Sequence, residues 1–140
     1  MAGEIGSHAR SKPSDSEKIT INLGYVDLGQ IDLLVAEGFY TNRTDLIRTA
    51  IRNQLARHDE ALRKSVDRKQ LDLGLRRFSR ADLEAALAAG QRLDIQVLGL
   101  ASIADDVSPD LAVKAIASIQ VLGALHASPA IKAALGDRIR

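Results

Sequence analysis

The sequence contains no cysteine and no tryptophan, and aromatic residues make up only 3% of its 140 residues. The absence of cysteine excludes disulfides and thiol chemistry. The three histidines, His8, His58 and His126, are far apart, and no pair of them has the spacing of metal ligands. No glycine-rich loop precedes a Lys-Ser or Lys-Thr pair, as a phosphate-binding loop requires. We therefore expect no enzyme activity, no catalytic or metal site and no cofactor.

Long apolar runs are also missing. No stretch approaches the roughly 20 apolar residues of a membrane-spanning helix, and the N-terminus lacks the apolar segment of a signal peptide. We expect a cytoplasmic protein with no membrane partner. The formal net charge is only +1, so the chain as a whole is not a polycation. Residues 41–69, however, include eight Lys and Arg but only four Asp and Glu. This local excess of +4 favours a polyanionic partner.

A short alternating segment follows a tail, residues 1–16, that has no periodicity and is expected to be flexible. Period-2 alternation of polar and apolar side chains predicts a half-buried strand over residues 18–23. The apolar positions are Ile19, Ile21 and Leu23, and the polar positions are Lys18, Thr20 and Asn22. A lone strand is not stable by itself. Pairing with the same strand of a second chain would give a two-stranded ribbon with one apolar and one polar face.

Two helical patterns come after this strand. The first covers about residues 26–37, with Asp27 as a candidate N-cap and Gly38 placed where a C-terminal capping glycine belongs. The second begins at Asn42, and Asp45 three residues later gives the pair the form of a capping box. Its apolar pattern continues to Val66, which predicts a helix that runs past His58 toward residue 69.

These elements resemble a known family. The strand at residues 18–23, the turn GFYTNRTD at residues 38–45 and the helix LIRTAIR at residues 46–52 resemble a ribbon-helix-helix domain of the MetJ/Arc/CopG superfamily. The resemblance covers residues 17–57, about a third of the chain. It implies a homodimer whose strand ribbon enters the major groove of double-stranded DNA.

The resemblance also assigns DNA contacts. The outward strand positions would read bases, because Lys can bond guanine, Asn can bond adenine and Thr can add a hydroxyl or methyl contact. The start of the second helix would hold the phosphate backbone, since its N–H groups and the helix dipole favour anions. The base contacts are Lys18, Thr20 and Asn22; the phosphate contacts are Asn42, Arg43, Thr44 and Arg48, with Arg52 as a further basic residue. For Arg48 and Arg52, salt bridges within the dimer are an equal alternative.

The second half carries an internal repeat. Gly74, Gly99 and Gly123, spaced 25 and 24 residues apart, each lie in a short apolar segment that precedes a serine-initiated helical segment. The helical segments are residues 79–89, 108–117 and 128–135. Two interpretations stay open: a small α/β solenoid in which each unit buries its neighbour, and a compact helical domain whose Ser-Pro caps are coincidental.

Together the patterns predict an α+β protein. We expect a flexible tail (1–16), a ribbon-helix-helix domain (17–57), a helical linker (58–70) and a repeat-containing assembly domain (71–140). The predicted function is a nucleoid-associated, sequence-specific transcriptional repressor that forms higher oligomers through residues 71–140. The alternatives are an antitoxin with a toxin partner and a DNA-organising or partition protein. A ligand-sensing regulator would need a polar pocket in the repeat region, which the sequence does not indicate.

Overall fold

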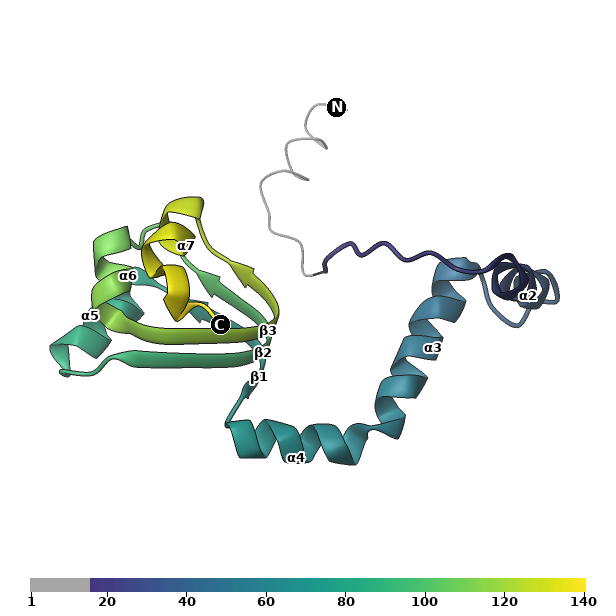
Figure 1. Ribbon diagram of the computed structural model, residues 1–140, viewed down its shortest axis with the longest axis horizontal. Helices are drawn as coiled ribbons and strands as arrows, with labels where there is room; N and C mark the ends of the chain where they lie inside the picture. Colours follow the sequence, from purple (N-terminus) through teal and green to yellow (C-terminus); the bar gives the residue numbers. More distant parts are fainter. Residues whose placement is uncertain (1–15) are drawn as a thin grey trace, which may run out of the picture. The chain divides into compact units, whose positions relative to one another are not determined.

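The computed structural model describes residues 16–140 (Figure 1), which separate into two compact units, one ending at Gln54 and the other spanning Leu55–Arg140. The chain is α+β: the described part contains six α-helices and a three-stranded sheet. The predicted tail lies outside the described residues, apart from Ser16.

No regular secondary structure is present from residue 17 to residue 24, and every side chain there is exposed. The strand predicted at residues 18–23 is therefore not formed in a single chain. The physical reason is that a strand satisfies its backbone N–H and C=O groups through a neighbouring strand, and the chain offers none at this position.

Helix α2 spans Tyr25–Ala36. Its N-cap is Gly24, whose carbonyl accepts the first helical hydrogen bond from the Leu28 N–H at 3.0 Å. The prediction of Asp27 as N-cap was wrong, because Asp27 already lies within the first turn, where its charge favours the positive end of the helix dipole. Gly38 ends this segment in the left-handed region (φ +85°), as predicted.

The second helical pattern forms two helices rather than one. Helix α3 spans Arg43–Arg57 and helix α4 spans Asp59–Lys69, so the predicted continuous helix is interrupted at His58. There the His58 N–H reaches the Leu55 carbonyl, and the His58 carbonyl accepts from the Leu62 N–H at 2.9 Å. His58 thus acts as the N-cap of α4, and two acidic residues in the following turn favour a new helix start.

The three repeat glycines lie in three parallel strands, arranged in the order β1-β2-β3. Gly74, Gly99 and Gly123 are directly paired across the sheet. An ideal Cβ on Gly99 would lie 2.2 Å from the carbonyl oxygen of Gly74, so neighbouring strands approach too closely there for any side chain. The interpretation as a purely helical domain was wrong. The strands are β1 (Asp72–Phe78), β2 (Leu93–Ile103) and β3 (Ile116–His126).

Three short helices cover one face of this sheet (Figure 1). Each begins at a serine whose hydroxyl oxygen accepts the N–H three residues later, a cap typically worth about 1 kcal/mol. The helices are α5 (Arg80–Ala88), α6 (Pro109–Ala115) and α7 (Pro129–Leu135), capped by Ser79, Ser108 and Ser128. The helix predicted to end at residue 117 stops earlier, because Ile116 has already turned to extended backbone and opens β3. A 3-10 turn, Gly136–Arg138, follows α7.

The hydrophobic core lies between the sheet and these helices. Among the described residues, every buried side chain lies between Leu71 and Leu135. The core includes Leu83 of α5, Val97 of β2, Ile119 of β3 and Ile131 of α7. Helices α2, α3 and α4 have no buried residue. The folded core of a single chain therefore belongs to the sheet-containing part.

Candidate nucleic-acid interface

The alternating segment before α2 presents both its polar and its apolar residues to solvent. Ile19 and Ile21 are 74% and 60% exposed, although alternation predicts that they are buried. The polar positions between them are also exposed, and they are Lys18, Thr20 and Asn22. An exposed apolar row of this kind needs a partner surface. Whether Lys18, Thr20 and Asn22 contact bases remains a prediction.

A small hydrogen-bond network fixes the start of α3. The Asn42 Oδ1 atom accepts the Asp45 N–H at 2.8 Å, and the Asp45 carboxylate accepts the Thr41 N–H at 2.9 Å. The pair resembles a capping box, but the carboxylate reaches one residue farther back than usual. The first turn still carries the N–H groups of Arg43 and Thr44, which have no helical carbonyl before them. These groups and the helix dipole form a suitable seat for a phosphate.

Arg43 is already engaged within the chain. Its guanidinium donates two hydrogen bonds to the Asp32 carboxylate of α2, at 2.7 and 2.8 Å. This contact lowers the pKa of Asp32, mainly through the hydrogen bonds, and raises the pKa of Arg43 for the same reason. The predicted phosphate contact thus also links α2 to α3. Sequence reasoning missed Asp32 because the two residues are 11 positions apart and lie on different helices, outside the i,i+4 pattern that sequence reveals.

Two further arginines stand out on α3. Arg48 and Arg52 are exposed, and neither takes part in an ion pair among the residues that the structure describes. Thr44, Arg48 and Arg52 follow one another at four-residue steps and so share a side of the helix.

On α4, by contrast, two of the four basic residues form ion pairs. Arg63 contacts Asp59 at 2.6 Å, and Lys64 contacts Glu60 at 3.3 Å. The excess positive charge between residues 41 and 69 is therefore concentrated on α3.

Comparison with known families decides the identity of this arrangement. The model of the Ribbon-Helix-Helix transcriptional regulator family matches residues 14–132, most of the chain. The chain belongs to this family. The ribbon-helix-helix fold implies DNA binding and dimerisation. No curated protein and no solved structure matched the chain in the corresponding searches.

The family match runs through both units of this ribbon-helix-helix protein. It begins before the alternating segment and ends within α7. The sheet with its helices is thus part of what defines the family. Sequence reasoning found the resemblance only in residues 17–57.

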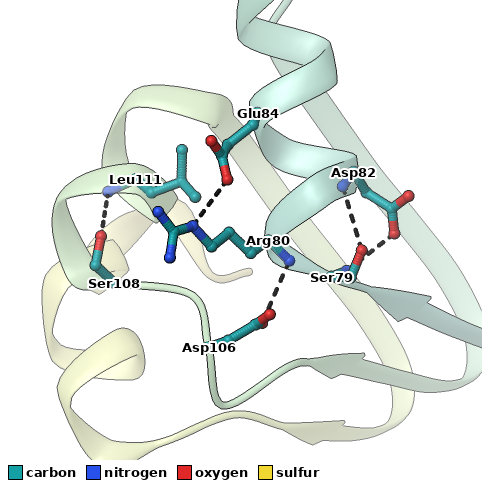
Figure 2. A network of polar contacts seen from close by, with 7 residues as sticks. All are labelled: Ser79, Arg80, Asp82, Glu84, Asp106, Ser108 and Leu111. Carbon is teal, nitrogen blue, oxygen red and sulfur yellow. Dashed lines mark hydrogen bonds and ion pairs between the residues drawn. The ribbon is translucent and has the colours of Figure 1, made fainter.

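The sheet unit contains a pocket of about 270 Å³ beyond the ends of β1 and β2, lined by Arg80, Glu84, Asp106, Ser108 and the apolar Leu111. Figure 2 shows two contacts in its lining: the Arg80 guanidinium donates to the Glu84 carboxylate at 2.8 Å, and the Arg80 backbone N–H donates to the Asp106 carboxylate at 3.3 Å. Ser108, also in the lining, caps α6. One of these contacts, from the Arg80 backbone to Asp106, joins one repeat to the next.

Neither a metal cluster nor a membrane-spanning helix is present in the described residues. Between residues 16 and 140, no three His, Cys, Asp or Glu side chains lie close enough together to hold a metal ion. No helix in this part of the chain has the length and apolar character needed to cross a bilayer. The candidate site is the surface of α3 and the alternating segment, which carries the exposed Arg48 and Arg52 and lies within the residues that the family model matches.

Proposed function

We propose that this protein is a dimeric, sequence-specific DNA-binding repressor. The observation that carries the proposal is the alternating segment, in which exposed Ile19 and Ile21 alternate with polar Lys18, Thr20 and Asn22. Two such segments paired antiparallel would bury the apolar rows against α2 and α3 of both chains. The polar rows would then form one face, of a width that the major groove accepts.

In this proposal the strand face reads the sequence. Lys18 can bond the O6 and N7 atoms of guanine, and Asn22 can form a bidentate pair with adenine. Thr20, between them, would donate its hydroxyl to an acceptor on a base or contact a thymine methyl group. Because the dimer has two-fold symmetry, the target would be an inverted repeat.

The start of α3 would hold the DNA backbone. The N–H groups of Arg43 and Thr44 offer a phosphate seat, and Arg48, which has no ion pair within residues 16–140, adds a positive charge on the same helix. The Asn42 side chain caps the helix, so its part would be to shape the turn. Arg43 would contact phosphate only by sharing or leaving Asp32. Residues 71–140 would join dimers into larger assemblies at DNA.

A selection experiment tests the proposal. Random double-stranded DNA is selected over several rounds with the full chain and with Lys18→Ala/Thr20→Ala/Asn22→Ala. The full chain should enrich an inverted repeat and bind it at least ~10³-fold more tightly than unrelated DNA. The triple variant should lose this preference but keep weak, salt-sensitive binding. Equal binding by both proteins without a motif would overturn sequence reading by the strand.

That contrary result would favour a DNA-organising or partition protein, which binds many sites with weak preference. An antitoxin is less well supported, because toxin-binding tails are typically disordered until bound, whereas residues 71–140 contain a sheet and a core. Repression itself is tested by placing the selected motif in a reporter promoter. Expression should fall when the full chain is present and should recover with the triple variant.

A further inference from the structure

One face of the three-stranded sheet is covered by helices and the other is not. Along β2, the buried residues Ile95, Val97, Ala101 and Ile103 alternate with side chains on the opposite face. Because the strands pair in register, these opposite side chains form rows across the sheet. We call this surface the leucine face; its members are Leu73, Leu75, Leu98, Leu100, Leu122 and Ala124.

The leucine face is apolar and open. Leu73 and Leu75 are 73% and 69% exposed, and Leu122 is exposed as well. Polar residues border it at both ends: Gln96 paired with Gln120 at one end, and the row of Arg77, Ser102 and His126 at the other. An apolar centre with a polar rim is the usual composition of a protein interface. Parallel sheets, moreover, normally have both faces covered.

Helix α4 of the same chain is poorly suited to cover this face. Only two residues separate it from β1, and the second, Leu71, is buried. The Leu71 N–H also bonds the Val66 carbonyl at 3.0 Å, which fixes the direction in which the chain leaves the helix. Folding α4 back over the sheet would break this cap and withdraw Leu71 from its buried site.

The size of the face identifies a better occupant. Three strands at about 4.8 Å spacing and seven paired positions at about 3.3 Å rise give a surface of roughly 300 Å². Stable interfaces between separate proteins usually bury about 800 Å² on each partner. A free partner would therefore bind this face weakly. A partner already tethered nearby would not need a larger surface, because tethering raises its effective concentration to the ~mM range.

We propose that the leucine face packs against the leucine face of a second copy of this chain. The proposal rests on the proposed function, because the ribbon dimer supplies the tether. The two sheets would stack face to face at about 10 Å, the normal spacing of packed sheets, with the leucine rows of one copy against those of the other. The self-complementary contact is the kind that two-fold symmetry requires.

The absence of native cysteine permits a direct test. Leu73→Cys and Leu122→Cys place a thiol on exposed positions of the leucine face. Glu84→Cys and Asp110→Cys place it on exposed helix positions and are the matched controls. Each full-length variant is diluted, without DNA, and treated with a short bismaleimide. We expect about tenfold more covalent dimer from the leucine-face positions than from the controls, because packing of the two faces would hold those thiols within reach of a short crosslinker, whereas the control thiols share only the ~mM effective concentration that the tether provides.

Two further measurements assign the result. Thiol labelling should be slower at the leucine-face positions than at the controls. Slow labelling without crosslinks would overturn the proposal, because something other than a second copy would then cover the face. Fast labelling without crosslinks would overturn it as well. Sedimentation before crosslinking reports the ribbon dimer separately. A monomer would refute the proposed dimer and its tether, whereas a dimer that does not crosslink refutes only the leucine-face contact.

Discussion

Two parts of the described chain, residues 16–70 and residues 71–140, treat their apolar residues in opposite ways. In residues 71–140, the sheet and its helices bury leucine, isoleucine and valine side chains completely. From residue 16 to residue 70, the described chain has helices of normal length but not one buried side chain. The first arrangement can fold within one chain, since hydrophobic burial drives folding. The second has no fully buried side chain to supply that driving force, so we expect a second chain to complete its core.

The comparison implies that function and assembly are coupled in the N-terminal unit. The residues proposed to read DNA and the residues proposed to form the dimer alternate along one segment. Because the period of a strand is 2, neighbouring residues face opposite sides. DNA reading would therefore require the dimer, whereas the sheet unit would keep its core in the monomer.

The largest effect is expected from Ile21→Asp. A carboxylate on the inner row of the ribbon would have to be buried without a partner, which is strongly unfavourable. We expect sedimentation to show loss of the dimer and specific DNA affinity to fall by ~10³, to the non-specific level. The sheet unit should still unfold cooperatively. Ile21→Val is the control and should keep the dimer. A dimeric Ile21→Asp variant with normal binding would disprove the ribbon.

Gly99→Ala should break the other unit. The new methyl group would meet the Gly74 carbonyl oxygen, and alanine would be held at a positive φ of 137°. Strain and overpacking together should lower the unfolding free energy of the sheet unit by about 3 kcal/mol or more. DNA binding by the N-terminal unit should persist.

Gly74→Ala is the matched control for the close approach. Gly74 has a similar φ of 119° but nothing within 4 Å of its Cβ position. It should therefore cost only the backbone strain, about 1–3 kcal/mol. Chemical denaturation of wild type, Gly74→Ala and Gly99→Ala separates the cost of backbone strain from the cost of overpacking. Equal losses for Gly74→Ala and Gly99→Ala would show that the strand approach carries no energetic weight.

A smaller effect should define the role of Arg43. If Arg43 contacts phosphate in the complex, Arg43→Gln should reduce the slope of log K against log salt by about 1. Asp32→Asn removes the competing carboxylate at the other end of the 2.7 Å contact and should leave that slope unchanged. If the slope of log K against log salt is unchanged in Arg43→Gln, Arg43 does not contact phosphate and its role is to link α2 to α3.

The contrast also explains how much the sequence could predict. The repeat glycines and the serine caps are local signals: the caps located the starts of α5, α6 and α7, and the glycines marked the apolar segments that form β1, β2 and β3, although a purely helical alternative had stayed open for them. The interruption at His58 was missed because the apolar pattern continues across it. The contact between Arg43 and Asp32 was missed because it joins two helices. Whether Lys18, Thr20 and Asn22 meet DNA depends on a second chain, which no periodicity within one chain can supply.

The smallest effect concerns pH and the first repeat helix. The Asp82 carboxylate accepts the Ser79 N–H at 2.9 Å, and this hydrogen bond lowers the pKa of Asp82 below the ordinary 3.8. A carboxyl whose pKa is lower in the folded state stabilises the fold at pH values above its unfolded-state pKa. This stabilisation is lost as the pH falls through its folded-state pKa. The stability difference between wild type and Asp82→Asn should thus be constant from neutral pH to about 4 and shrink below it.

Ser108→Ala serves as the control for that titration. Its hydroxyl caps α6 through the Leu111 N–H and does not titrate, so its loss of about 1 kcal/mol should be the same at every pH. Thermal unfolding of the sheet unit at several pH values measures both variants. If the Asp82→Asn difference were as flat as that of Ser108→Ala, the carboxylate charge would contribute nothing and the cap would act through its hydrogen-bond geometry alone. If the stability difference between wild type and Asp82→Asn shrinks only below about pH 4, the charge of Asp82 stabilises the sheet unit, which keeps its core without a second chain.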